Sequence, residues 1–184
     1  MPLGATQTVP VKPSPPNAQD VTLGITYVTQ KPFKNLCWAA CGAMIFQYYK
    51  IPNVSIGDIA SKVLGLNCNL QPAPAACDTA VWPQNMYGAY DFSCQTAGAA
   101  LSLQSVQAWI ANMQPVQPYF QWSDDEGNHT VLIVGYYANG DLLIYDPLWG
   151  IGRQTYQFVL YAYGRGTWQD TWYNIRPLSN VPLA

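Results

Sequence analysis

Hydrophobic and polar positions follow two different periods along this chain, and the period changes past its middle. Over residues 37–50, apolar side chains such as Trp38, Cys41 and Ile45 recur at steps of three and four. This spacing predicts a helix, and the small residues between them indicate that it is buried. Pro52 should end it, because proline cannot continue a helix.

Two more segments have the helical period. Ser55 is a suitable N-cap for a short second helix that reaches residue 63. A third helix is predicted within residues 101–113, with Ser102 or Ser105 as its cap. The stretch between them, residues 65–100, is the least regular part of the chain. A loop of that length in a compact domain needs pinning or a function.

Patterns typical of strands dominate the last third of the chain. They cover residues 115–122, 129–137, 141–145, 153–157 and 167–175, and an earlier one covers residues 21–30. Asn139-Gly140, between two of these strands, is a strong signal for a tight hairpin turn. Successive strands joined in this way form an antiparallel sheet.

The chain of 184 residues is long enough for one domain with a sizeable core. We expect a single α+β domain over residues 21–184, with a helical half, 21–113, packed against an antiparallel β half, 114–184. A cleft should lie between the halves. Residues 1–20 contain five prolines and no regular period, so we expect a flexible arm there, serving as a tether or a processed remnant.

Composition restricts the possible partners and compartment. Charged residues make up 10% of the chain and the net charge is −2, without a basic cluster, which disfavours nucleic acid and anionic membranes. No apolar run approaches the roughly 20 residues of a membrane span. The odd number of cysteines, five, fits an exported protein with a free thiol and up to two disulfides. We therefore expect secretion or translocation, directed by a signal outside this sequence or by a route that needs none. A reduced intracellular protein with five free thiols is the alternative that fits less well.

His129, the single histidine, begins the apolar run Thr130-Val131-Leu132-Ile133-Val134. A histidine on a strand is most often packed or solvated, yet this imidazole alone has an ordinary pKa suited to acid–base chemistry near neutral pH. Asp146 ends the next predicted strand. Counting outward from the hairpin turn places it almost opposite His129, so we expect the carboxylate to orient the ring. The alternative for Asp146 is an Asx-Pro turn.

Cys37 stands at the predicted start of the first helix. Unpaired N–H groups and the helix dipole stabilise a thiolate in that position, and a neighbouring imidazolium does so further. The alternatives are a buried apolar cysteine and half of a disulfide. A zinc site of Cys37, Cys41 and His129 is also conceivable, but structural zinc sites use close cysteine pairs twice over. We therefore expect no metal.

Three segments of the chain carry the motifs of one family. They are Gln30…Cys37-Trp38-Ala39-Ala40, then Gly127-Asn128-His129-Thr130-Val131-Leu132-Ile133-Val134-Gly135-Tyr136, and Ile144-Tyr145-Asp146-Pro147-Leu148-Trp149-Gly150. They resemble the papain-like cysteine peptidases, and in particular their compact bacterial branch, which includes secreted peptidases and effector proteases. The resemblance covers about residues 25–175.

The resemblance implies a role for each residue of the site. Cys37 is the nucleophile, His129 the base, Asp146 the orienter of the base and Gln30 an oxyanion donor beside the Cys37 backbone N–H. Two features depart from papain itself: the gap from Gln30 to Cys37 is one residue longer, and an aspartate replaces the usual asparagine. An aspartate holds an imidazolium electrostatically, so it should favour the ion pair with a thiolate.

The other tryptophans and cysteines receive secondary roles. Trp122 and Trp149 each follow a predicted catalytic strand, so we expect them, together with Trp38, to contact substrate. A core position is the alternative for these aromatic residues. A disulfide between Cys68 and Cys77 would close a short part of the irregular stretch. Two further alternatives are a Cys41–Cys94 bridge and buried free thiols.

These expectations describe a cysteine endopeptidase that cleaves protein substrates through a thioester, without any cofactor. We expect a monomeric bacterial protease, effector or toxin that is exported, with an inhibitor or immunity protein as a possible partner. Two alternatives remain open. The same residues could catalyse another acyl transfer, such as glutamine deamidation or transamidation, or the fold could serve as a non-catalytic binding module.

Overall fold

A computed structural model describes residues 19–52, 54–123 and 127–178. Its elements, in chain order, are β1 (Val21–Thr22), α1 (Cys37–Tyr48), α2 (Ile56–Leu64), η1 (Ala75–Cys77), α3 (Pro83–Ala89), β2 (Phe92–Thr96), α4 (Leu103–Ala111), β3 (Gln117–Trp122), β4 (Asn128–Thr130), β5 (Leu132–Tyr136), β6 (Leu142–Asp146), β7 (Gly150–Gln154), α5 (Tyr156–Leu160), η2 (Ala162–Gly164) and β8 (Gly166–Pro177). The expected α+β class is confirmed.

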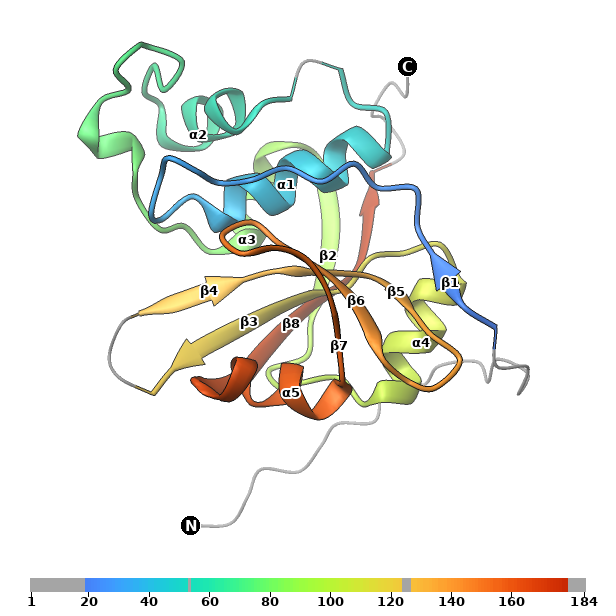
Figure 1. Ribbon diagram of the computed structural model, residues 1–184. Helices are drawn as coiled ribbons and strands as arrows, with labels where there is room; N and C mark the ends of the chain where they lie inside the picture. Colours follow the sequence, from blue (N-terminus) through green and yellow to red (C-terminus); the bar gives the residue numbers. More distant parts are fainter. Residues whose placement is uncertain (1–18, 53, 124–126, 179–184) are drawn as a thin grey trace.

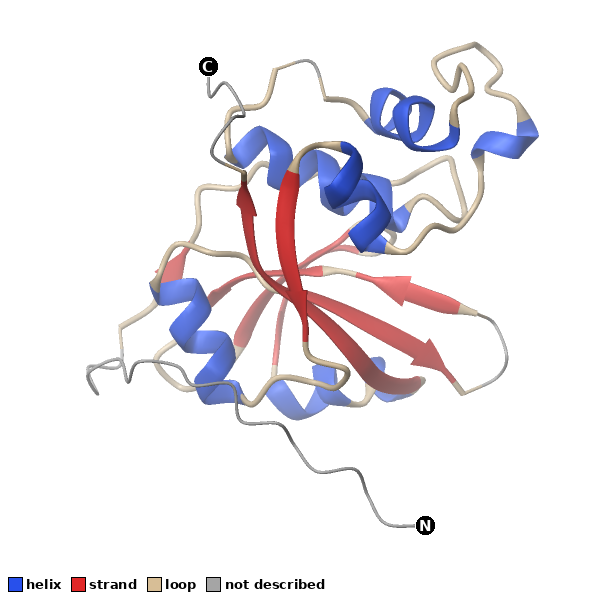
Figure 2. Ribbon diagram, turned by 180° about the vertical axis from the view of Figure 1, so that it is seen from behind, coloured by secondary structure: helices blue, strands red, loops and turns tan. Residues whose placement is uncertain are grey.

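The strands form two four-stranded antiparallel sheets. The first has the order β1-β5-β6-β7, and the second has the order β2-β8-β3-β4. Helices α1, α2 and α3 lie together over one end of the strands, whereas α4 and α5 lie at the opposite end (Figures 1 and 2). The first residue of α1 therefore faces the strands of the β half, and α1 contacts β4 directly.

Helix α1 is the centre of the core. All residues from Trp38 to Phe46 are buried. Its Phe46 ring stacks on Tyr90, with ring centroids 4.4 Å apart. Gly42 lets α3 approach closely, because a Cβ atom there would lie 2.2 Å from Sδ of Met86. This buried helix holds Cys37 against the sheets as a rigid support.

The three helices predicted from periodicity are confirmed, and so are two of their caps. Ser55 and Asp58 form a capping box at the start of α2. Ser102, rather than Ser105, caps α4, and its side chain accepts the N–H of Ser105. These caps depend on contacts between residues three apart, which is why they can be read from the sequence.

Several strands differ from expectation. The strand expected over residues 21–30 is only β1, of two residues. The run expected to form one strand over residues 129–137 is divided at Val131 into β4 and β5, which belong to different sheets. The strand expected over residues 153–157 is β7, shifted to Gly150–Gln154, and α5 follows it. A period-two pattern does not reveal where a chain leaves one sheet for another.

The irregular stretch and the division into two halves also differ from what the sequence predicted. Residues 65–100 contain η1, α3 and β2. Strand β2 pairs with β8, and α4 packs on β5. Both elements come from the part of the sequence expected to form the helical half, so the β half includes residues from before position 114. Residues 1–18 of the expected arm lie outside the described residues. No helix within the described ranges is long and apolar enough to span a membrane.

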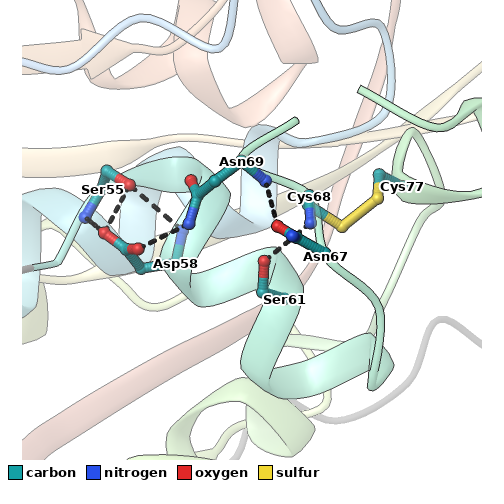
Figure 3. The surroundings of a disulfide bond; sticks show 7 residues. All are labelled: Ser55, Asp58, Ser61, Asn67, Cys68, Asn69 and Cys77. Carbon is teal, nitrogen blue, oxygen red and sulfur yellow. Dashed lines mark hydrogen bonds between the residues drawn. A yellow bond between two sulfur atoms is a disulfide. The ribbon is translucent and has the colours of Figure 1, made fainter. Parts of the chain in front are cut away.

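A disulfide joins Cys68 to Cys77 beside α2 (Figure 3). Polar contacts fasten the same loop to the helix: the Cys68 N–H donates to the Ser61 hydroxyl at 2.8 Å, and Asn69 donates to the Asp58 carboxylate at 2.8 Å. Cys41 and Cys94 are both free thiols, so the alternative bridge between them is wrong. The disulfide and these hydrogen bonds fix the loop between α2 and η1, for which the sequence predicted no regular structure.

Candidate active site

Cys37 is the first residue of α1, and the loop before it is held by one carboxylate. Both oxygens of Asp78 accept the N–H of Lys34, at 3.0 and 3.1 Å, and Oδ1 also accepts the N–H of Asn35 at 2.7 Å. Asp78 directly follows Cys77, so the disulfide lies next to this anchor. The half-buried thiol of Cys37 thus stands at a helix start whose approach is fixed.

His129 and Asp146 lie on different sheets but are joined by a hydrogen bond. His129 is the middle residue of β4, and Asp146 is the last residue of β6. His129 Nε2 donates to Asp146 Oδ1 at 2.8 Å, and the two residues are 4% and 3% exposed. The two residues meet across the break between β4 and β5, because the ladder of β5 and β6 begins only at Leu132 and Tyr145.

The electrostatics of His129 favour its protonated form. Burial, the largest single influence, lowers the pKa of His129. Hydrogen bonds to Asp146 and Cys37, together with the negative charges of these two side chains, overcome burial and raise the pKa from 6.5 to about 9. Since Nε2 faces Asp146, Nδ1 is the nitrogen left for Cys37. The ring is therefore a proton donor at neutral pH, oriented toward the thiol.

Asp146 is itself held in place by the turn that follows it. Its Oδ1 accepts the N–H of Leu148 at 2.8 Å and the N–H of Trp149 at 3.1 Å. The alternative of an Asx-Pro turn is therefore also true, and one carboxylate both forms the turn and orients His129. The Tyr27 hydroxyl donates to the Asp146 carbonyl at 2.9 Å and ties the start of the chain to this turn.

Two tryptophans enclose the imidazole. Trp122 is buried and stacks on His129, with centroids 5.9 Å apart and planes 18° apart. Trp149 is half exposed and meets the ring edge-on at 5.5 Å. Trp122 thus packs the base, whereas Trp149 presents a face to solvent beside it. A substrate contact fits Trp149 better than Trp122.

A cavity of about 150 Å³ opens beside Cys37. It is lined by Cys37, Trp38, Ala80, Val81, Trp82, Pro83, Tyr119, Asn128, His129 and Thr130. Trp38 contributes a wall, while its indole N–H donates to the Thr79 carbonyl at 2.9 Å. Val81, Trp82 and Tyr119 were not identified from the sequence. Of these three residues, only Trp82 carried a signal in the sequence, because it stands directly before Pro83, a residue that favours a helix start.

The sequence profile described as the peptidase C39-like family matches residues 22–179. The chain belongs to this family. It is a papain-like cysteine peptidase, as the resemblance of its motifs predicted. No curated protein sequence matches the chain significantly.

Solved structures that resemble this peptidase are distant from it in sequence. A protein assigned as a C39-like peptidase from Bacillus anthracis has 16% identity and a TM-score of 0.55, over 87% of this chain and 100% of its own. A double glycine motif protease from an AMS/PCAT transporter, in complex with its leader peptide, has 17% identity and a TM-score of 0.50, over 88% and 100%. Prevotella intermedia interpain A has 14% identity and a TM-score of 0.49, over 89% and 98%.

Gln30 of this peptidase lies in a different environment from the one expected for an oxyanion donor. It is fully buried, and its Nε2 donates to the carbonyls of Phe33 at 3.2 Å and Lys34 at 2.8 Å. Both amide hydrogens are thus directed to the loop that leads to Cys37. Its Oε1 has no hydrogen-bond partner among the described residues. The oxyanion role of Gln30 stays a prediction.

Cys41, one helical turn after Cys37, is a buried thiol in this peptidase. Its Sγ lies 3.6 Å from the Thr130 carbonyl, to which it donates. Burial, followed by the charges of Cys37 and Asp146, raises the pKa of Cys41 well above its usual value. The Cys41 thiol is therefore held in its protonated form. Within the described residues, no three His, Cys, Asp or Glu side chains are grouped as metal ligands.

Proposed function

We propose that this peptidase is an exported endopeptidase that cleaves protein or peptide substrates through a thioester at Cys37. The observation that carries the proposal is the His129 imidazole, held by Asp146 at 2.8 Å and lining the same cavity as Cys37. This arrangement places a nucleophile, a proton donor and a residue that orients the donor side by side.

In the first half of the reaction, the Cys37 thiolate attacks the carbonyl carbon of the scissile peptide bond. The negative oxygen that forms accepts a hydrogen bond from the Cys37 backbone N–H, which is unpaired at the helix start. The C–N bond then breaks while His129 transfers its proton to the departing amine. The products are a thioester on Cys37, a free amine and a neutral imidazole.

In the second half, the neutral imidazole of His129 removes a proton from water. The resulting hydroxide attacks the thioester carbonyl, the C–S bond breaks, and the acid product leaves Cys37 as a thiolate beside imidazolium. Asp146 stabilises the imidazolium at both ends of the cycle. The enzyme returns to its starting protonation state, so no cofactor is required for this chemistry.

The cavity beside Cys37 supports binding of a mainly apolar substrate side chain. Val81, Trp82 and Tyr119 form its walls, and Asn128 and Thr130 flank the base at its rim. Trp82 is half exposed, so the cavity opens to the surface where a chain can enter. The leader-peptide complex of the structural neighbour offers a parallel for such an extended ligand.

The disulfide supports the proposal of export. Bonds such as Cys68–Cys77 persist in oxidising compartments and are rare where thiols are kept reduced. The low charge of the chain, 10% of residues, agrees with this. An inhibitor or immunity protein that covers Cys37 would be a suitable partner for a bacterial effector or toxin, and this role is part of the same proposal.

The test is cleavage by the whole chain and by its Cys37→Ala variant, with new protein N-termini mapped across a proteome. We expect new termini with the wild-type chain only, and alkylation of Cys37 by an epoxide inhibitor of thiol peptidases. Ammonia release from glutamine side chains without new termini would replace hydrolysis with deamidation. An unreactive Cys37 at neutral pH would instead indicate a binding module.

A further inference from the structure

A second cavity, of about 260 Å³, lies on the side of Asp146 and Trp149. It is lined by Ile144, Asp146, Trp149, Gly150, Ile151, Gly152, Gln154, Phe158 and Tyr163. None of these residues belongs to the cavity beside Cys37. The two cavities flank His129, since His129 lines the first and contacts Asp146 and Trp149 of the second.

Two residues of β7 that line the cavity, Gly150 and Gly152, lack side chains. Gly150 and Gly152 alternate with the exposed Ile151 along the strand. A Cβ on Gly150 would meet nothing within 4 Å, and one on Gly152 would meet only the flexible end of Gln154, at 3.2 Å. Larger residues at these positions would fill the cavity.

The walls of the cavity are aromatic. Tyr163 lies edge-on to Trp149 at 5.8 Å and beside Phe158 at 5.6 Å. Tyr163 has φ 61° and Ala162 has φ 46°, a left-handed conformation that costs energy for residues with side chains. The contacts with Trp149 and Phe158 hold the Tyr163 ring in this position, at the end of this left-handed turn.

A buried carboxylate closes the inner end. Asp146 Oδ1 already accepts three hydrogen bonds, whereas Oδ2 accepts none of standard geometry from the described residues. The Tyr163 hydroxyl lies close to this carboxylate. Burial, and after it the Asp146 charge, raises the pKa of Tyr163. Aromatic faces combined with a carboxylate form an environment that attracts an organic cation.

One cation of the protein already lies against these indole rings. The Arg165 guanidinium lies 5.1 Å from the Trp122 ring centroid and 5.6 Å from that of Trp149. Ile151 and Phe158 add apolar surface at the cavity mouth, where the methylene stem of a lysine or arginine would pack.

We propose that this cavity is a subsite for a basic side chain, lysine or arginine, on the leaving-group side of the cleaved bond. The proposal rests on the proposed function, because His129 must protonate the leaving amine and so lies between Cys37 and the departing chain. That chain emerges beside Trp149. Its basic side chain places the cation between Trp149 and Tyr163, facing Asp146.

The first experiment measures binding without catalysis. Nα-acetyl-lysine N-methylamide and its norleucine and glutamate counterparts are titrated into the Cys37→Ala chain, followed by amide and indole NMR shifts. We expect the lysine probe to shift the signals of Gly150, Gly152 and Trp149 and to bind at least about tenfold more tightly than norleucine. Equal binding of norleucine, or shifts confined to the cavity beside Cys37, would overturn the proposal.

The second experiment uses peptides that the wild-type chain cleaves. Lysine, norleucine and glutamate are compared at each of the three positions after the cleaved bond, with kcat/KM as readout. At one of these positions, kcat/KM should be about tenfold higher for lysine than for norleucine. Gly152→Val, or the smaller Gly152→Ala, should bring that ratio toward one. The matched control is Arg153→Gln, the next residue of β7, whose side chain pairs with Asp141 and does not line the cavity, and it should keep the ratio.

The two experiments separate the two proposals. Selective binding of the lysine probe without any peptide cleavage supports a cation-binding cavity, but it refutes the endopeptidase and with it the assignment of the cavity to the leaving-group side. Cleavage with no preference at any of the three positions refutes the subsite and leaves the endopeptidase intact.

Discussion

At the scale of single residues, His129 shows how two opposing influences are balanced. Burial alone lowers the pKa of His129, as it does for any buried cation. The Asp146 carboxylate and the Cys37 side chain reverse the direction, because both stabilise the charged ring. The stacked Trp122 excludes water and strengthens these interactions. The reactive protonation state is therefore set by neighbours that lie on three different elements.

This balance predicts the alkaline limit of activity. Because His129 must be protonated to release the amine, kcat/KM should fall as pH rises through about 9. Asp146→Asn removes one cause of the raised pKa, so the alkaline limb should move to lower pH, along with a large loss of rate. A pH profile of kcat/KM tests this. Asp141→Asn, a remote carboxylate paired with Arg153, is the control and should leave the limb in place.

Gln30 allows a second prediction at this scale. Gln30→Leu removes the donors to the Phe33 and Lys34 carbonyls, which should lower the free energy of unfolding by about 1–2 kcal/mol. A residue that acted only as an oxyanion donor would leave stability unchanged and lower kcat by about 10²–10³. Thermal unfolding and steady-state kinetics of the same variant distinguish the two. An unchanged Tm would contradict the loop-tying role.

The proximity of Cys37, His129 and Asp146 was predictable from the sequence, but their full surroundings were not. Cys37, His129 and Asp146 were found because a helix start, a single histidine and a strand end are local features of the sequence. Gln30 was assigned by resemblance, and its amide is used by a loop whose shape no periodicity reveals. Val81 and Tyr119 line the cavity through contacts between distant segments, which one sequence does not report.

At the scale of elements, the position of His129 depends on the break between β4 and β5. Residue 131 leaves the second sheet, and the next residue enters the first. His129 is therefore paired with Phe120 of β3 while its side chain reaches Asp146 of β6. The sequence predicted this pair correctly by counting from the hairpin turn, but it predicted one continuous strand. A continuous strand would have kept both residues in one sheet.

The contact between α1 and α3 gives a prediction about stability. Gly42→Ala places a methyl group against Met86, so overpacking of about 1–3 kcal/mol should exceed the helix-propensity gain of about 1 kcal/mol. Thermal unfolding should show a lower Tm. The matched control, Gly88→Ala, is an exposed position of α3 with nothing within 4 Å, and it should raise Tm slightly. A stabilised Gly42→Ala chain would show that Met86 moves away at little cost.

At the scale of the whole molecule, Cys37 and the pair of His129 and Asp146 come from parts of the chain that the sequence analysis assigned to separate halves. Strand β2 and helix α4 precede residue 114, yet they belong with the sheets. Long-range pairing of this kind is decided by packing of faces rather than by local pattern, so the predicted boundary between residues 113 and 114 does not separate the helices from the sheets. The fold class itself followed from the order of periods along the chain.

The disulfide connects this global arrangement to the nucleophile. Cys77 is bonded to Cys68, and the next residue, Asp78, holds the loop before Cys37. Cys68→Ala/Cys77→Ala should therefore lower the free energy of unfolding by about 2–3 kcal/mol and also lower kcat/KM, because the loop loses its fixed anchor. Denaturant unfolding and peptide cleavage of the double variant measure both effects. Cys94→Ala removes a free, half-buried thiol far along the chain and serves as the control. If the double variant lost stability but kept full activity, Asp78 would hold the loop without help from the disulfide.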